Sequence, residues 1–393
     1  MTFSLQFDAV AEARPGTAWK TRWERSWPAY EAWWIASGGD NGPSRAACEA
    51  ALAKHMPELV PVHKRLTALA GGSDRAARFL STWCPPAYLG GCSLAARADA
   101  GEVRLLRNYD LSPELNEGLL LRTEWTGMPV MGMVEFLWGL SDGINGAGLS
   151  VALAYGGSAA VGEGFGITTI LRYVLETCAD LDEALAVLAR VPSHMAYNLV
   201  LADRHGNTSA VELRPGGGLR QRDQSIATNH QRGGPAPDRP AFTRTLAREE
   251  RLESLFAAEV SPSGLSEAFL AEPLFQRDYA QGFGTLFTTE YDPGTGAMTL
   301  LWPDERWQQT LDDFKPGSRL VHYEEQSTES NGLAATLALV RPFLPSASQA
   351  RLDTWLSASA GGAADWEAFG RLFADGWMNP PIAKGTARTE RHT

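Results

Sequence analysis

Residues 90–110 read GGCSLAARADAGEVRLLRNYD, and this stretch decides the fold and the chemistry that the sequence predicts. Two glycines precede Cys92, and the strand-like run EVRLLRNY that follows carries Arg107 and leads into Asp110. A cysteine is a good nucleophile only as the thiolate, so a base must activate it. That base is usually a histidine, but it can be the α-amino group of the cysteine itself if the cysteine is the first residue of a chain.

An internal cysteine becomes the first residue of a chain when the peptide bond before it is cut. The thiol of Cys92 can make that cut by attacking the carbonyl group of Gly91, because glycine tolerates strained backbone conformations and leaves its carbonyl uncovered. Taken alone, the pattern is more typical of a structural role. Gly-Gly-Cys is more often a turn before a buried structural cysteine, and a stretch such as Arg107 to Asp110 is more often a surface ion pair.

Helices are expected on the N-terminal side of this stretch, within residues 1–91. Trp19, Trp23 and Trp27 recur every four residues and therefore share one helix face, which is a packing pattern. Ser73 is the expected N-cap of a shorter helix that follows.

Strands alternate with helices on the C-terminal side. Strand-like runs bounded by turn residues lie at 102–109, 131–139, 149–155, 197–215, 225–230 and 284–303. The run at 166–192 predicts two helices instead, with Asp180 and Glu183 arranged as a capping box for the second. Residues 331–375 are expected to be helical, ahead of a loose polar tail. This order of elements indicates an α+β protein with helices packed on antiparallel sheet.

Composition argues against several classes of protein. The formal net charge of −11 is spread without long like-charge runs, and nucleic-acid binding needs a basic face, so such binding is not expected. No run of about 18 apolar residues predicts a membrane span, and the N-terminus lacks the basic start and apolar run of a secretory signal. The four cysteines show neither CxxC spacing nor clustering with histidine, so no metal site or disulfide framework is predicted and a reducing cytoplasm is the expected location.

From Cys92 to about Pro303, the sequence resembles the N-terminal nucleophile hydrolases of the choloylglycine hydrolase and penicillin acyltransferase group. The matching pieces occur in the family's order: Cys92 with RNYD, SDGINGAGLSVALAY, the helix pair GFGITTILRYVLE and DEALAVLARV, NLVLADRHGNTSAVE, ATNH, and FGTLFTTEYDPGTG. The acyl-coenzyme A:isopenicillin N acyltransferase branch is the more similar one, because it also carries a segment of about this length before the cysteine and uses TNH.

The resemblance implies a four-layer αββα fold and a division of the chain into three parts. Residues 1–91 would be a helical prosegment that becomes the small subunit. Residues 92–310 would be the catalytic core, and residues 311–393 a helical C-terminal extension with a loose tail. Cleavage between Gly91 and Cys92 is also implied, after which the two pieces would stay associated as a heterodimer.

The resemblance also assigns roles to residues of a site. Cys92 would be the nucleophile of both self-cleavage and catalysis, and Asp110 would hydrogen-bond and orient its freed amino group. Arg107 would lie beside the thiolate and lower the pKa of the thiol. Asn229 and the backbone N–H of Tyr155 would form the oxyanion hole. Bile-salt hydrolases carry Asn where this chain has Tyr155, so the chain departs from them at that position.

Three further residues are candidates for supporting roles. Arg248 is the expected match to a second arginine of the hydrolases, with Arg239 and Arg244 as competitors because the Gly/Pro-rich loop before them leaves the alignment open. Asn198 is interpreted as structural or pocket-lining. His230 would be the base of a rival mechanism, in which it forms a papain-like pair with the cysteine. The residues after the cysteine read as a strand, however, whereas papain-like enzymes begin a helix there.

The function that the resemblance implies is that of an autoprocessed cysteine amidohydrolase or acyltransferase acting on a linear amide or a thioester. The acyl group of this small-molecule substrate would pass through a thioester on Cys92 to water or to an amine, without a metal or cofactor. Two alternatives stay open: a Cys92–His230 hydrolase without self-cleavage, and a non-catalytic protein of the same fold.

Overall fold

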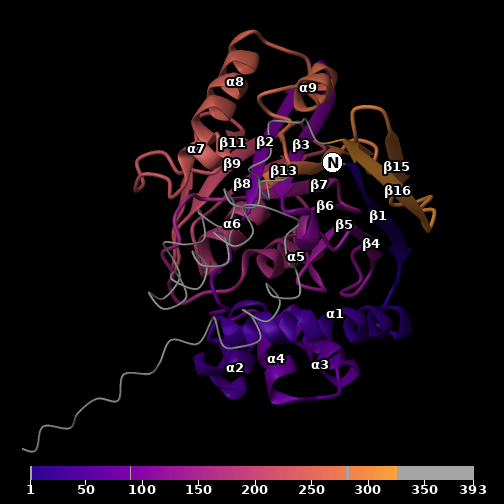
Figure 1. Cartoon of the computed structure of the whole chain (residues 1–393), viewed down its shortest axis with the longest axis vertical. Helices are drawn as coiled ribbons and strands as arrows, with labels where there is room; N and C mark the ends of the chain where they lie inside the picture. The colour runs from indigo at the N-terminus through magenta and orange to yellow at the C-terminus, as the bar shows by residue number, and fades with distance from the viewer. Residues whose placement is uncertain (1, 89, 280–282, 325–393) are drawn as a thin grey trace, which may run out of the picture. The chain divides into compact units, whose positions relative to one another are not determined.

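The computed structural model describes residues 2–88, 90–279 and 283–324 (Figure 1). The chain divides into two compact units, Met1–Thr328 and Glu329–Thr393, and every described residue lies in the first. The helical stretch expected at 331–375 and the polar tail lie outside the described residues. Within the described ranges, no helix combines the length and the apolar character needed to span a bilayer.

The stretch at 90–110 forms one β-hairpin. β2 (Gly91–Asp99) and β3 (Glu102–Leu111) pair antiparallel, in a register that sets Cys92 opposite Tyr109. Ala100 and Gly101 join the two strands with φ values of 49° and 86°. This left-handed backbone is the one that two-residue hairpin turns use, because its twist matches that of the flanking strands.

The hairpin lies in a seven-stranded sheet, with strand order β11-β2-β3-β13-β14-β15 and β12 paired to β13. All neighbours in this sheet are antiparallel. Its other strands are β11 (Ile226–Ala227), β12 (Arg277–Asp278), β13 (Phe283–Asp292), β14 (Ala297–Leu301) and β15 (Arg306–Thr310). β13 and β14 pair antiparallel within the strand-like run predicted at 284–303.

A second sheet has nine strands in the order β10-β9-β8-β7-β6-β5-β4-β1-β16. Its strands are β1 (Thr2–Ala11), β4 (Leu119–Thr123), β5 (Val130–Glu135), β6 (Gly139–Asn145), β7 (Leu149–Tyr155), β8 (Tyr197–Asp203), β9 (Thr208–Leu213), β10 (Leu219–Gln221) and β16 (Gly317–Glu324). Neighbours are antiparallel except for β1 and β4, which are parallel.

Helices cover the outer face of each sheet (Figure 1). α5 (Ile167–Thr177) and α6 (Leu181–Arg190) pack on the nine-stranded sheet. α8 (Thr245–Ala257) and α9 (Pro262–Phe269) pack on the seven-stranded sheet, and the single turn α7 (Pro240–Thr243) precedes α8. The predicted cap of α6 is present, because the Asp180 side chain accepts a hydrogen bond from the Glu183 N–H at 3.0 Å.

Three apolar cores fill the interfaces between these four layers. Alternate residues of β2 serve two of them, because successive side chains of a strand point to opposite faces. Leu94 and Ala96 lie between the two sheets, whereas Ala95 faces α8 and α9. The third core joins α5 and α6 to the nine-stranded sheet. The predicted α+β class with αββα layers is therefore confirmed.

The first 88 residues contribute one strand and several helices. After β1 come α1 (Thr17–Ala36), α2 (Arg45–His55), α3 (Val60–Leu69) and α4 (Asp74–Ser81), with 3-10 turns at Gly39–Asn41, Pro57–Leu59 and, later in the chain, Pro113–Leu115. The predicted tryptophan stripe is present on α1: Trp19 and Trp23 are buried, and Trp27 stacks on Trp23 with 4.3 Å between ring centroids. The Ser73 side chain caps α4 as expected, accepting from the Ala76 N–H at 3.2 Å.

The expected bounds of the catalytic core do not match the strands of the nine-stranded sheet. Residues 2–11, within the mostly helical prosegment that the sequence predicted, form a strand, and so do residues 317–324 of the expected helical extension. The reason for the first is alternation, since Phe3, Leu5 and Phe7 share the face of β1 that packs between the sheets. β16 pairs with β1, and β1 pairs with β4, so the nine-stranded sheet recruits strands from both sides of the expected 92–310 core.

A cut at the Gly91–Cys92 bond is therefore expected to leave the two pieces associated. β1 is hydrogen-bonded on one edge to β4 and on the other to β16, and both of those strands belong to the larger piece. Trp19 of α1 also donates from Nε1 to the carbonyl oxygen of Leu137 at 3.0 Å. The pieces should co-elute from a sizing column in native buffer and separate only in denaturant. Native elution of a free 91-residue piece would contradict this expectation.

Candidate active site

Cys92 lies at the start of β2, and its side chain faces the layer between the two sheets. The residue is only 2 % exposed. Arg107 reaches the same layer from the paired strand β3, and its Nη2 donates to the Cys92 sulfur at 3.2 Å. The structure thus brings together the two residues that the hairpin sequence singled out.

Three groups of the opposite sheet hold the Arg107 side chain. Its Nε donates to the Leu153 carbonyl oxygen at 3.0 Å, and its Nη1 donates to Ser141 Oγ at 3.0 Å and Asp142 Oδ2 at 2.8 Å. Arg107 and Asp142 are both fully buried, so each compensates a charge that would otherwise be strongly destabilising. Asp142 was missed as a site residue. It lies in the quoted SDGIN motif, but its contact with Arg107 arises only when the two sheets pack.

The Cys92 thiol is held in its neutral form. Burial raises its pKa to about 11, because an apolar layer disfavours the charged thiolate. Arg107 opposes this increase through its charge and its hydrogen bond, whereas the carboxylates of Asp110 and Glu135 add to it. A base close to the sulfur is therefore needed before the thiol can act as a nucleophile at neutral pH.

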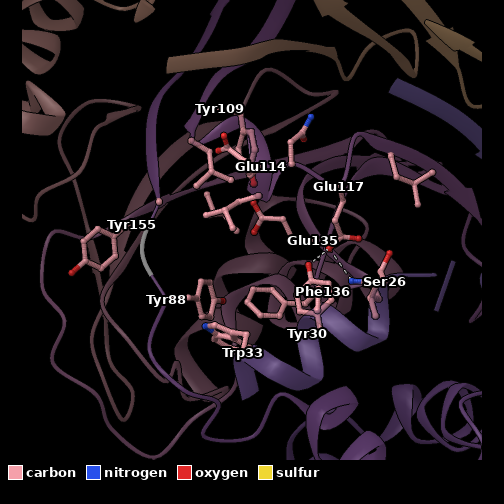
Figure 2. Close-up of a pocket in the computed structure, with 18 of the residues that line it drawn as sticks. Ser26, Tyr30, Trp33, Tyr88, Tyr109, Glu114, Glu117, Glu135, Phe136 and Tyr155 are labelled. Atoms are coloured by element: carbon pink, nitrogen blue, oxygen red, sulfur yellow. Dashed lines mark hydrogen bonds between the residues drawn. The ribbon is translucent and has the colours of Figure 1, made fainter. Parts of the chain in front are cut away.

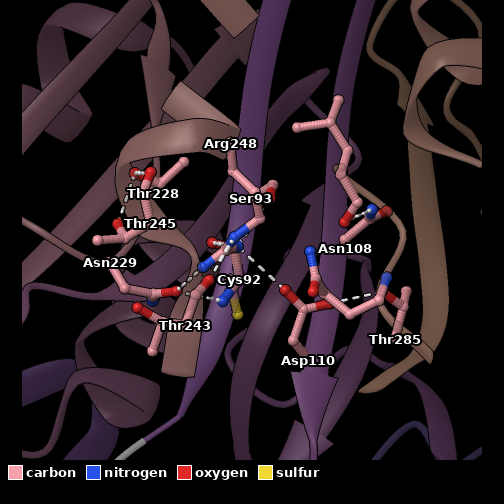
Figure 3. Close-up of polar contacts among 12 residues, drawn as sticks. Cys92, Ser93, Asn108, Asp110, Thr228, Asn229, Thr243, Thr245, Arg248 and Thr285 are labelled. Carbon is pink, nitrogen blue, oxygen red and sulfur yellow. Dashed lines mark hydrogen bonds and ion pairs between the residues drawn. The ribbon is translucent and has the colours of Figure 1, made fainter. Parts of the chain in front are cut away.

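A second buried arginine reaches Cys92 from the other face of the sheet. Arg248 of α8 donates from Nη1 to the Cys92 carbonyl oxygen at 2.6 Å and to Ser93 Oγ at 2.8 Å (Figure 3). The same nitrogen lies 3.0 Å from Asp110 Oδ2. Of the three arginines considered for this role, only Arg248 takes it. Arg244 pairs with an aspartate outside the site, and Arg239 lies over the ring of Phe242.

Both carboxylate oxygens of Asp110 have a partner. Its Oδ2 binds Arg248, and its Oδ1 accepts a hydrogen bond from Thr285 Oγ1 at 2.6 Å. Burial raises the pKa of Asp110, against the opposing effects of Arg248 and Thr285. In the continuous chain, the backbone N–H of Cys92 donates to Asn229 Oδ1 at 3.0 Å rather than to Asp110.

The side-chain amide of Asn229 has a fixed orientation. Its Oδ1 accepts from the Cys92 N–H and, at 2.5 Å, from Arg248 Nη2. An amide oxygen accepts and an amide nitrogen donates, so this pair of donors forces Nδ2 to the opposite side. There Nδ2 donates to the Tyr155 carbonyl oxygen at 3.2 Å. Asn229 is thus a donor aimed at the end of β7, beside the nucleophile.

The backbone of Tyr155 points toward the same place. Beyond the ends of the β7–β8 ladder, the Arg204 N–H donates to the Gly148 carbonyl oxygen and the Gly156 N–H donates to the Ala196 carbonyl oxygen. Antiparallel pairs alternate along a ladder, so Tyr155 falls on a pair that is not hydrogen-bonded. Its N–H and C=O therefore point away from β8, to the side where the pairing with β6 has already ended at Ala152. The Tyr155 hydroxyl instead binds Asp238 at 2.6 Å.

Asn198 supports the segment that carries Asn229. Its Nδ2 donates to the backbone carbonyl oxygens of Thr228 and His230, both at 2.8 Å. Asn198 lies in β8 of the other sheet, so it fixes the loop after β11 against the sheet interface. The structural interpretation made from the sequence agrees with this placement.

The His230 ring is directed away from Cys92. Its Nε2 lies 2.5 Å from Glu249 Oε2, and its Nδ1 lies 2.9 Å from Thr245 Oγ1. Although burial opposes the effect, the hydrogen bond from His230 and the charges of Arg222 and Arg232 lower the pKa of Glu249 to about 2. Both ring nitrogens of His230 are therefore committed to α8, and the geometry does not form a Cys92–His230 pair.

A cavity of about 560 Å³ opens onto Cys92 (Figure 2). Arg107 and Tyr155 line it beside the cysteine, and α1 of the N-terminal segment supplies part of the wall with Tyr30 and Trp33. This volume is in the range of small-molecule sites. The buried thiol is therefore accessible from a chamber large enough for an organic substrate.

The residue before Cys92 is under a steric constraint. A Cβ atom on Gly91 would collide with the ring of Phe283, which follows the segment at 280–282 and packs near Arg248. Gly90 has no such neighbour. Only the second glycine of the Gly-Gly-Cys sequence is thus required by close packing.

Comparisons with solved structures give distant likenesses. A mutant of conjugated bile acid hydrolase from Clostridium perfringens shares 12 % identity over 61 % of this chain and 100 % of its own, with a TM-score of 0.35. Penicillin V acylase from Agrobacterium tumefaciens shares 17 % identity over 56 % of this chain and 86 % of its own, with a TM-score of 0.38. The Caenorhabditis elegans ortholog of N-acylethanolamine-hydrolyzing acid amidase shares 17 % identity over 58 % of this chain and 99 % of its own, with a TM-score of 0.40.

Sequence comparison identifies the family. No curated protein sequence matches the chain. A family profile described as acyl-coenzyme A:6-aminopenicillanic acid acyl-transferase matches residues 97–307. The match begins just after Cys92 and takes in Arg107, Asp110, Asn229 and Arg248. It covers more than half of the 393 residues, and the chain therefore belongs to the acyl-coenzyme A:6-aminopenicillanic acid acyl-transferase family.

Proposed function

We propose that the protein is a self-processing cysteine enzyme that hydrolyses or transfers the acyl group of a linear amide or thioester through a thioester on Cys92. The observation that carries this proposal is the position of Cys92. Its sulfur lies against Arg107, its backbone nitrogen is held by Asn229, and its side chain meets a cavity of about 560 Å³. The family to which the chain belongs supports acyl transfer as the type of reaction.

Self-cleavage is the first proposed step. The Cys92 sulfur attacks the carbonyl carbon of Gly91, and the Gly91–Cys92 C–N bond breaks as its nitrogen takes up a proton, which leaves a thioester on the sulfur. Water then attacks the thioester carbonyl and releases the Gly91 carboxylate and the free thiol. The new α-amino group stays within reach of Asn229 Oδ1, which already accepts from that nitrogen in the continuous chain. Asp110 and Arg248 hold the surrounding backbone.

Turnover of an external substrate follows the same chemistry. The α-amino group takes the thiol proton, and the thiolate attacks the acyl carbon of the substrate. Asn229 Nδ2 and the backbone N–H of Tyr155 donate to the oxygen that becomes negatively charged. The leaving amine or thiol takes the proton and departs. Water or an acceptor amine then attacks the acyl-Cys92 thioester and regenerates the thiol.

Intact mass measurement of the purified protein tests the cleavage. Chains of 91 and 302 residues are expected, whereas a Cys92→Ala variant should stay a single inactive chain of 393 residues. Cys178→Ala is the matched control, because that thiol is also buried and its pKa is also raised to about 11. The control should be cut like the wild type. An active, uncut wild-type chain would overturn the proposed mechanism.

The rate of self-cleavage should rise with pH. The pKa of Cys92 is about 11, so between pH 6 and pH 9 the thiolate fraction in the uncut chain grows about tenfold per pH unit. Cell-free translation at several pH values would follow the appearance of the 302-residue chain. A rate that does not change over this range would show that thiolate formation does not limit cleavage.

Two neighbouring variants separate the oxyanion role from a base role. Asn229→Ala should fold but lose about 10²–10³ in turnover, the loss typical of one oxyanion donor. His230→Ala should lose far less, because its ring binds Glu249 and Thr245 rather than the cysteine. Steady-state rates on a chromogenic ester or amide, with circular dichroism as the folding control, give the comparison. A His230 variant weaker than the Asn229 variant would identify the histidine as the base.

A further inference from the structure

The lining of the cavity beside Cys92 combines carboxylates with aromatic side chains. Figure 2 shows Glu114, Glu117 and Glu135 in the same lining as Tyr30, Trp33, Tyr88 and Phe136. A substrate that fills the cavity must therefore place part of itself beside carboxylates.

The arginines of the lining act on these carboxylates only through their charge, Arg22 on Glu117 and Arg107 on Glu135. Arg22 forms an ion pair with Glu12 at 3.1 Å, and Arg107 forms one with Asp142 at 2.8 Å, so both guanidinium groups are matched by acids that do not line the cavity. Arg25 is exposed to solvent.

Glu117 has a structural task of its own. Its Oε1 accepts from the Tyr30 hydroxyl at 2.5 Å and from the Leu137 N–H at 3.1 Å. Phe136 and Leu137 have φ values of 56° and 68°, a conformation that is unfavourable for such side chains. Glu117 thus holds a strained turn in the cavity wall.

Glu135 holds no such turn, and its side chain forms a hydrogen bond with Tyr109. It ends β5, is partly buried, and shares the lining with Cys92 and Tyr109. Within residues 2–88, 90–279 and 283–324, it forms no ion pair with any Lys, Arg or His. The hydrogen bond with Tyr109 and the charge of Arg107 compensate Glu135 only in part, because burial still raises the pKa of Glu135. A cation in the chamber would therefore stabilise the charged form of this carboxylate.

We propose that Glu135 determines the substrate specificity of this cavity by binding a positively charged amine of the substrate close to the scissile bond. The substrate class is then an amide or thioester with a primary or secondary ammonium group and an apolar, aromatic-compatible remainder. This inference rests on the proposed function of Cys92.

The position of Glu135 also couples binding to the nucleophile. The charge of Glu135 raises the pKa of Cys92. Burial raises the pKa of Glu135 itself, and this increase is opposed by the charge of Arg107 and by the hydrogen bond with Tyr109. A bound ammonium group would offset the negative charge of Glu135 and so favour the thiolate. Neutral or anionic substrates add no cation to the partial compensation by Arg107 and Tyr109.

Calorimetric titration of the wild-type protein at pH 7 tests the proposal without requiring turnover. The probes are phenethylamine, 2-phenylethanol and phenylacetate, which are similar in size and differ in charge. The amine should bind about tenfold more tightly than the alcohol, equivalent to about 1.4 kcal/mol, and the carboxylate should bind least. Equal binding of the three probes, or preference for the carboxylate, would overturn the proposal.

Two variants then show whether Glu135 is the side chain that causes the preference for the amine. Glu135→Gln keeps the shape of the side chain and removes its charge, so the preference for the amine should disappear. Glu102→Gln is the matched control, because Glu102 is exposed on β3 and does not line the cavity. A preference that survives in the Glu135 variant would reject Glu135 as its source. Amine preference in a protein that hydrolyses no amide or thioester would sustain this inference and reject the proposed function.

Discussion

Two buried arginines meet at the first residues of β2 from opposite faces of one sheet, and much of the site depends on that arrangement. Arg107 reaches the Cys92 sulfur from the layer between the sheets, whereas Arg248 reaches the Cys92 carbonyl oxygen from the helical layer. A buried charge without a partner is strongly destabilising. Asp142 and Asp110 supply those partners, so the charge of Arg107 is tolerated only when the hairpin meets the nine-stranded sheet, and that of Arg248 only when α8 packs on the hairpin.

This arrangement fixes the backbone around Cys92 before any chemistry takes place. Arg248 holds the Cys92 carbonyl group and the Asn229 amide at once, which leaves Asn229 Nδ2 as a donor beside the end of β7. The thiol itself is not activated in the continuous chain, because burial raises its pKa to about 11. An amine created at the same residue would supply the missing base within the existing geometry, so the proposed self-cleavage and catalysis would share one site.

The sequence predicted the strand that carries Arg107 and the helix pair because each has a local signature, and the family resemblance supplied the candidate site residues. Cys92 and Arg107 lie in one quoted stretch, and paired strands bring them together. Partners that arise only when layers pack had no such signature. Asp142 and Glu135 lie on the other sheet, and Arg248 follows a loop whose length no pattern fixes. β1 was taken for part of a helical region, since its pairing strands β4 and β16 are far away in the chain.

The acyl-enzyme on Cys92 is the most direct test of this mechanism. A nitrophenyl ester would be mixed with the protein, quenched in acid within milliseconds and mapped by peptide mass spectrometry. Acid keeps the α-amino group protonated, so an acyl group on sulfur stays there. The expected result is an acyl adduct on the peptide that begins at Cys92, removable by hydroxylamine as a thioester is. An adduct on another residue, or rapid turnover with no adduct on Cys92, would contradict the mechanism.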